Sequence, residues 1–178
     1  MRKTIVSGSI ILSLIAIYLL VAVITPVVHV TVERNINQSV ENSFRTLMNP
    51  FKFQYWIPGF QSVKPLSGEM NTPSSENIIV LEFKGREFLV YQKITDYERF
   101  RRFGFLSKYK SLEVMSVFVF NSSTSSATMS AKFDLRTRSF LQRPVLLLSL
   151  PRIRKMANKA ADDLKAIIES GEGTRMFL

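Results

Sequence analysis

The side chains best suited by type to proton transfer lie on two neighbouring predicted strands: Glu82, Glu87, Tyr91 and Asp96. A carboxyl or phenol group becomes a useful general acid or base when burial moves its pKa toward the working pH. Strand alternation does not settle which of these four side chains face inward. We therefore assign no catalytic residue and predict no cofactor.

Other chemistries are excluded by what the composition lacks. The chain has no cysteine, and so no disulfide, thiolate metal site or cysteine nucleophile. Its single histidine, His29, lies at the edge of the most apolar segment, which removes a Ser-His-Asp arrangement. A metal site made of carboxylates alone needs a cluster of oxygen ligands, and Asp162-Asp163 is too short for one. No metal site is predicted.

Basic residues outnumber acidic ones, with 24 Lys and Arg against 14 Asp and Glu and a net charge of +10. One group falls in the first half of the last predicted helix: Arg152, Arg154, Lys155 and Lys159. A cation near the first turn of a helix interacts unfavourably with the helix dipole, which costs about 0.3–1 kcal/mol for each charge. One interpretation is that these cations are present because they bind anionic headgroups at a membrane surface. A solvated face paired with nearby carboxylates is the other. Without a recognition-helix signature or zinc spacing, no nucleic-acid partner is predicted.

An apolar segment precedes the predicted domain. Residues 5–27 carry no formally charged side chain, and about 20 apolar residues suffice for a helix to cross a bilayer. The run is longer than that of a signal peptide and lacks a small-x-small cleavage site. We predict a transmembrane anchor over residues 1–28, with the lipid bilayer as partner through residues 5–27. The positive-inside rule, applied to Arg2 and Lys3, favours a cytoplasmic N-terminus and an extracytoplasmic domain in a single-pass membrane protein.

Residues 29–171 are predicted to form one α+β domain, followed by a tail of residues 172–178. Alternating apolar positions predict a strand from Val30, then two short helices, the first capped by Ser39. A run of about six antiparallel strands follows, with Lys84-Gly85 as a hairpin turn. The last element is a long amphipathic helix with Pro151 in its first turn.

Two segments resemble a known superfamily. VTVERNINQSVENSFRTLMNPFKFQYWIPGFQSVKPL is similar to the start of SRPBCC, or START-like, domains of the polyketide cyclase/dehydrase and lipid-transport type. Those domains open with a strand, a helix ending near Asn/Asp-Pro, a Trp-x-Pro turn and a second strand. RIRKMANKAADDLKAIIES resembles their C-terminal helix. The resemblance covers roughly residues 29–170. It implies a helix-grip fold, in which a curved antiparallel sheet of six or seven strands surrounds the long helix.

The same resemblance implies a hydrophobic cavity between sheet and helix, which holds lipids, sterols, isoprenoid quinones or polyketides in various members. Cyclases and hydrolases also belong to the superfamily, but none of their catalytic residues carries over onto this sequence. The resemblance implies that Trp56, the one tryptophan, helps to close the cavity; the alternative is that it fills the core.

The candidate ligand-binding residues are side chains that strand or helix periodicity can direct inward. They are Trp56, Phe83, Phe88, Phe103, Phe105, Met129, Phe133, Met156, Ala160 and Leu164. The same side chains would equally fill a closed core, because the sequence does not show whether large and small residues interdigitate or leave a void.

The leading interpretation is a membrane-anchored protein that binds a small hydrophobic ligand, such as a lipid or an isoprenoid quinone, between the sheet and the C-terminal helix. A first alternative is an accessory structural subunit of a larger membrane protein complex, with a filled core. A second alternative is a cyclase- or hydrolase-type enzyme that acts on a lipid-like substrate. A filled core favours the first alternative, and a cavity containing a buried acid favours the second.

Overall fold

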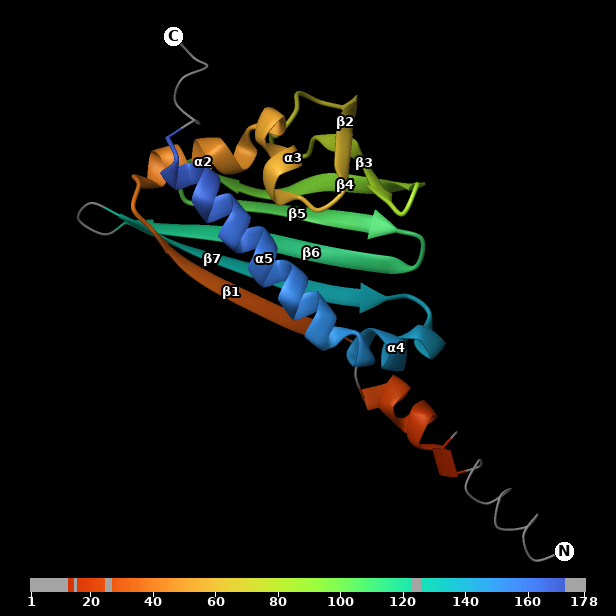
Figure 1. Cartoon of the computed structure of the whole chain (residues 1–178). Helices are drawn as coiled ribbons and strands as arrows, with labels where there is room; N and C mark the ends of the chain where they lie inside the picture. Colours follow the sequence, from red (N-terminus) through yellow and green to blue (C-terminus); the bar gives the residue numbers. More distant parts are fainter. Residues whose placement is uncertain (1–12, 15, 25–26, 123–125, 172–178) are drawn as a thin grey trace, which may run out of the picture.

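The chain forms seven strands, which pair in one antiparallel sheet (Figure 1). Successive side chains of a strand point to opposite faces of the sheet. The computed structural model describes residues 13–14, 16–24, 27–122 and 126–171. The strands are β1 (Val28–Ile36), β2 (Phe60–Ser67), β3 (Glu76–Phe83), β4 (Arg86–Glu98), β5 (Arg102–Tyr109), β6 (Leu112–Ser122) and β7 (Ala127–Thr137). Their order across the sheet is β1-β7-β6-β5-β4-β3-β2. The predicted α+β class and the strand number are confirmed.

Strands β2 to β7 form a meander in which each strand pairs with the next along the chain. Lys84 and Gly85 join β3 to β4 with φ angles of 54° and 70°, as a two-residue hairpin turn with positive φ at both positions requires. Strand β1 instead pairs with β7, with His29 opposite Asp134. The first strand, β1, therefore forms one edge of the sheet and lies beside the last strand, β7.

The helices lie on one face of this curved sheet (Figure 1). They are α2 (Val40–Met48), η1 (Pro50–Lys52), α3 (Phe53–Trp56), η2 (Phe140–Gln142), α4 (Arg143–Leu148) and α5 (Leu150–Glu169). The Ser39 hydroxyl accepts a hydrogen bond of 3.2 Å from the Asn42 backbone N–H and caps α2 as predicted. Asn49 ends α2, and its side-chain oxygen accepts a 3.0 Å bond from the backbone N–H of Phe51, which starts η1.

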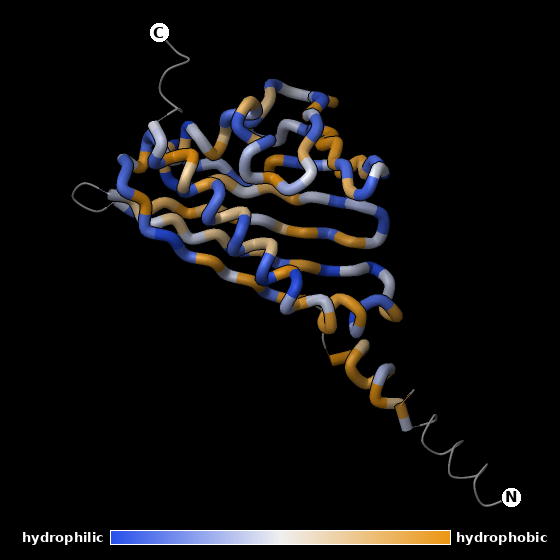
Figure 2. The backbone as a smooth tube through the Cα atoms, in the orientation of Figure 1, coloured by the Kyte–Doolittle hydropathy of each residue, from blue (hydrophilic) through white to orange (hydrophobic). Residues whose placement is uncertain are grey.

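The core lies between the sheet and the helices, and one part of it is formed by α5 with the first and last strands. Val28, Val30 and Val32 of β1 are buried, as are Ala161, Leu164 and Ile168 of α5. In β7 the apolar face, Ala127 to Leu135, is buried except for the half-buried Phe133. Figure 2 shows the corresponding alternation of hydrophobic and hydrophilic positions along α5, which is the period expected of a helix with one face on a sheet.

The segment before β1 corrects one prediction. Residues 16–24 are helical, and they contact the region of α4, where Arg143 Nη1 donates a 3.1 Å hydrogen bond to the Ala22 carbonyl. Among the residues that the structure describes, no helix combines the length and apolar content needed to cross a membrane. This finding contradicts the predicted localisation as a single-pass membrane protein with a cytoplasmic N-terminus. Residues 1–12, which hold part of the predicted span, and the tail from residue 172 lie outside the described residues.

Candidate ligand-binding site

The space between the sheet and the helices is filled by aromatic rings. Trp56 of α3 packs edge-on against Phe118 of β6 with ring centroids 6.1 Å apart, and Phe118 stacks on Phe105 at the same distance. The void enclosed there has a volume of about 10 Å³, and its lining is Leu47, Phe53, Trp56, Ile57, Asn71, Gln92, Phe103 and Phe105. That is room for about one water molecule.

Several polar atoms near this void have no hydrogen-bond partner among the described residues. They include Trp56 Nε1 and both side-chain polar atoms of Asn77, a residue that is only 1% exposed. Asn77 lies opposite Gln92 in the β3–β4 register, so the two side chains share a face of the sheet. An unpaired buried polar group costs about 1–3 kcal/mol. The interior therefore contains polar atoms that could form hydrogen bonds but have no partner among the described residues.

The structure brings some of the predicted ligand-binding residues together and separates others. Trp56, Phe103 and Phe105 line the void, and Phe133 reaches Phe118, which packs on Trp56. Met129 and Leu164 are fully buried in the core.

Phe83 and Phe88 contact each other at a centroid distance of 5.8 Å, and Phe88 also contacts Tyr109. On α5, Ala160 is half-buried and Met156 is largely exposed. Their role in binding stays a prediction.

The four candidate proton-transfer residues lie outside the interior void. Glu82 and Glu87 are exposed and face each other across the β3–β4 hairpin. Asp96 forms an ion pair of 2.5 Å with Arg102. Burial, followed by a hydrogen bond with Glu76, raises the pKa of Tyr91. Within the described ranges, no group of three His, Cys, Asp or Glu side chains is placed to hold a metal ion.

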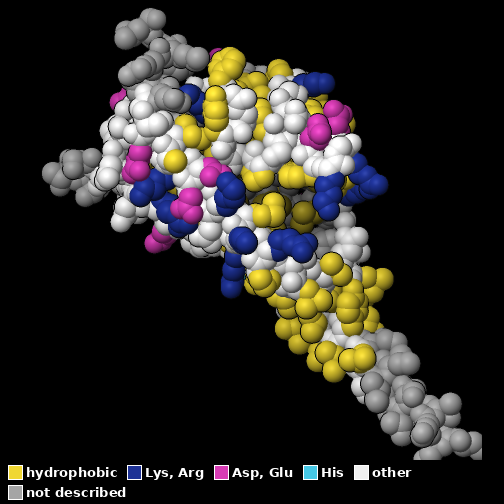
Figure 3. Space-filling view, viewed as in Figure 1, with side chains coloured by type: hydrophobic (Ala, Val, Ile, Leu, Met, Phe, Trp, Pro, Cys, Tyr) yellow, Lys and Arg dark blue, Asp and Glu magenta, His cyan; other side chains and the backbone are white. Residues whose placement is uncertain are grey.

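The basic group on α5 is exposed to solvent. Figure 3 shows Lys and Arg side chains interspersed with Asp and Glu over this helix. Lys159 pairs with Asp163 one turn later at 2.6 Å, as the interpretation of a solvated face expects. Arg152, Arg154 and Lys155 are exposed on the same half of the helix.

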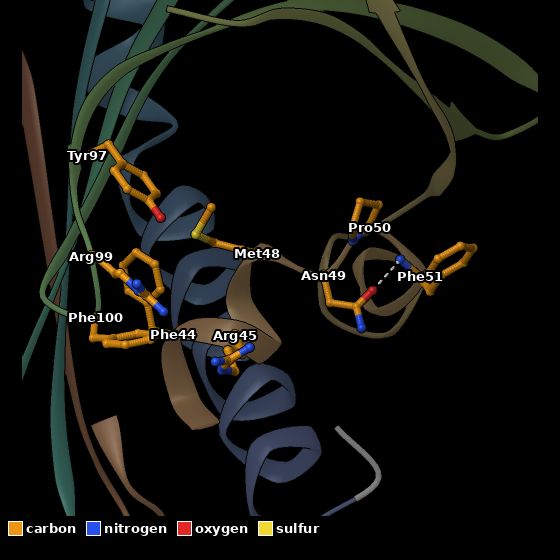
Figure 4. A pocket seen from close by; sticks show the side chains of 9 residues that line it. All are labelled: Phe44, Arg45, Met48, Asn49, Pro50, Phe51, Tyr97, Arg99 and Phe100. Carbon is orange, nitrogen blue, oxygen red and sulfur yellow. Dashed lines mark hydrogen bonds between the residues drawn. The ribbon is translucent and has the colours of Figure 1, made fainter. Parts of the chain in front are cut away.

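A much larger pocket lies where α2 meets the turn between β4 and β5 (Figure 4). Its volume is about 520 Å³. We call it the α2 pocket, and its lining is Phe44, Arg45, Met48, Asn49, Pro50, Phe51, Tyr97, Arg99 and Phe100. Two separate stretches therefore build it: residues 44–51, from the second half of α2 to the start of η1, and residues 97–100, at the end of β4 and in its turn.

Phe44 packs between rings of the α2 pocket and rings of the interior. Its ring, 2% exposed, packs edge-on against Tyr97, Phe100, Phe103 and Phe120, with centroid distances of 5.9 to 6.4 Å. Tyr97 and Phe100 line the α2 pocket, whereas Phe103 lines the interior void. Phe44 therefore lines the α2 pocket and contacts a ring that lines the interior void.

The α2 pocket combines apolar walls with cationic groups. Phe51 also lines the pocket, but it is 76% exposed and its ring points away from the β4–β5 turn in Figure 4. The guanidinium carbon of Arg99 lies 4.6 Å from the centroid of the Phe100 ring, and that of Arg45 lies 5.5 Å from it. Sequence reasoning missed this site. The sequence feature that could have indicated the pocket is the mixture of basic and aromatic residues from Arg99 to Phe105. That pattern does not show that these residues lie against α2.

Comparisons with known proteins concern the fold. Neither the protein-family models nor the curated proteins that were searched contain a match. Among solved structures, Ara h 8.0201 superposes with a TM-score of 0.68 at 12% identity, covering 82% of this chain and 99% of that chain. The protein TTHA0849 from Thermus thermophilus gives a TM-score of 0.65 at 11% identity, covering 82% and 99%.

SA2116 from Staphylococcus aureus also superposes, with a TM-score of 0.66 at 10% identity over 81% of this chain and 94% of that chain. These likenesses, together with the seven-stranded sheet and the C-terminal helix, show that the chain has the helix-grip fold. The fold predicted from the resemblance is confirmed.

Proposed function

We propose that this protein binds a small hydrophobic ligand, and that the ligand occupies the α2 pocket. The observation that carries the proposal is a pocket of about 520 Å³ walled by Phe44, Met48 and Phe100. Pockets for small molecules in proteins have volumes of about 300–1,000 Å³ and are lined mainly by apolar and aromatic side chains, with a few polar groups that fix orientation. The α2 pocket meets each of these criteria.

A second position is the one predicted from the sequence, between the sheet and the C-terminal helix. The interior void of about 10 Å³ is lined by residues of α2, α3, β4 and β5 and by none of α5, and it is too small for a lipid or a quinone. Binding in the interior therefore requires the rings around Trp56 to separate. The unpaired Trp56 Nε1 and Asn77 amide support this position, because a polar group of a ligand would satisfy them. The filled interior, by contrast, supports the alternative of an accessory subunit.

The test is binding of the uncharged fluorescent probe N-phenyl-1-naphthylamine to the full chain, with direct excitation of the probe. Met48→Trp fills the α2 pocket and is expected to weaken probe binding at least tenfold. Leu66→Trp is the matched control, because Leu66 is an exposed residue of β2 outside the pocket. Ala160→Trp, on α5, is expected to leave binding unchanged.

The other outcomes separate the two positions. Loss of binding in Ala160→Trp with retention in Met48→Trp would place the ligand between the sheet and α5. Equal binding by all the variants would show that the probe occupies neither position. Failure of the natural sequence to bind the probe would contradict the proposed function and favour the accessory subunit.

A further inference from the structure

Two arginines approach the same aromatic ring at the α2 pocket. The guanidinium groups of Arg99 and Arg45 lie 4.6 and 5.5 Å from the centre of the Phe100 ring, and Figure 4 shows both beside that ring. Each gains a cation–π contact, but two like charges on one ring also repel each other. An arrangement of this kind is stabilised by a nearby negative charge.

The protein supplies a counter-charge for only one of the two arginines within the described part of the chain. Arg45 donates hydrogen bonds of 2.9 and 2.7 Å to Glu41 Oε1, from Nε and Nη2. No carboxylate or hydrogen-bond acceptor within the described residues pairs with Arg99, and the pocket lining contains no Asp or Glu. By contrast, Arg101 and Arg102, next along the chain, are paired with Glu98 and Asp96.

The backbone at Phe100, the residue whose ring both arginines approach, has an unfavourable conformation. Phe100 has a φ of 61°, in the left-handed region that bulky side chains seldom adopt. The conformation places its ring edge-on to Phe44 at 6.0 Å and under the Arg99 guanidinium. Unfavourable backbone conformations of this kind persist where the surrounding contacts determine them, and they concentrate at binding sites.

We propose that the α2 pocket binds an amphipathic anion, with a carboxylate group held by Arg99 and an apolar body against Phe44, Met48 and Phe100. This inference rests on the proposed function and adds the chemical class of the ligand. A guanidinium group presents paired N–H donors in the plane that a carboxylate accepts. Arg45, already bound to Glu41, contributes a second positive charge at the same end of the pocket.

The experiment compares dodecanoate with dodecanol, which carries the same chain without the charge, by displacement of N-phenyl-1-naphthylamine from the full chain. Dodecanoate is expected to bind about three- to tenfold more tightly, a modest factor because Arg99 is exposed to solvent. Arg99→Gln is expected to remove most of this difference by weakening dodecanoate binding more than dodecanol binding. Added salt is expected to weaken dodecanoate binding alone.

Arg101→Gln is the matched control, because it removes the same charge from the same turn but does not line the pocket. Circular dichroism and thermal melts of both variants establish that they fold. Equal binding of dodecanoate and dodecanol, or equal losses in the two arginine variants, would overturn the anionic ligand class while leaving the proposed function in place. Failure of both compounds to displace the probe would overturn the ligand class, and failure of the probe itself to bind would overturn the proposed function.

Discussion

At the scale of the residue, Phe44 is the side chain on which both the core and the α2 pocket depend. It is 2% exposed and contacts four other aromatic rings. Phe44→Ala is expected to lower the free energy of unfolding by about 3–5 kcal/mol, from lost burial and the cavity left behind. Urea denaturation monitored by Trp56 fluorescence measures this loss. A change below about 1 kcal/mol would show that the rings around Phe44 are not packed as described.

Asn77 leads to the opposite expectation. Its amide is buried and unpaired among the described groups, so replacing it with an apolar side chain of similar size removes a desolvation cost. Asn77→Leu is expected to raise the free energy of unfolding by about 1–2 kcal/mol. Asn121→Leu, at an exposed position of β6, is the control and is expected to change it by less than about 0.5 kcal/mol. Destabilisation by Asn77→Leu would show that the amide has a partner, such as an ordered water.

At the scale of the element, two glycines in turns give a matched comparison. Gly59 connects α3 to β2 with a φ of 73°, and an added Cβ would lie 2.5 Å from the Glu82 carbonyl oxygen. Gly85 has a φ of 70° in the β3–β4 turn, but nothing lies within 4 Å of an added Cβ. Gly85→Ala is therefore expected to cost about 1–2 kcal/mol, from the left-handed conformation alone.

Gly59→Ala is expected to cost more than Gly85→Ala, because its added methyl group also displaces the backbone of β3. Thermal melts of the two variants measure the difference. Equal destabilisation would mean that the α3–β2 turn moves away from Glu82 without cost.

The elements themselves were largely predictable from local pattern. The side chain of Ser39 specifies a helix cap, and the backbone of Lys84-Gly85 specifies a hairpin turn. The structure has both at the predicted positions. Helix α4 was not predicted, because its apolar residues run into α5 with only Ser149 between them. The α2 pocket was not predicted either, since Phe44 and Phe100 meet only after the sheet has brought distant segments together.

At the scale of the whole molecule, ion pairs tie the elements to one another. A hydrogen bond from Lys93 lowers the pKa of Glu76, and one from Arg138 lowers that of Glu113. A hydrogen bond from Arg34 of β1 likewise lowers the pKa of Asp162 of α5. These carboxylates stabilise the folded state at pH values above the ordinary carboxyl pKa, and the stabilisation is lost as the pH falls through their folded-state values.

The melting temperature is therefore expected to be nearly constant from about pH 7 to pH 5 and to fall below about pH 4. A variant with Glu76→Gln and Glu113→Gln is expected to show a shallower acid decline. Melting curves at several pH values measure both. An identical decline in the variant and the natural sequence would show that these two ion pairs do not carry the pH dependence.

The pairing of β1 with β7 has a consequence for synthesis on the ribosome. His29 and Asp134, opposite each other in the sheet, are 105 residues apart in the chain. At about 5–20 residues per second, β1 is made on the order of 5–20 s before its partner strand. The hairpins from β2 to β7 form from contacts that are local in sequence. Strand β1 therefore has no partner in the sheet until β7 has been made, and the speed of translation through β2–β6 sets the shortest time for which Val28, Val30 and Val32 lack that partner.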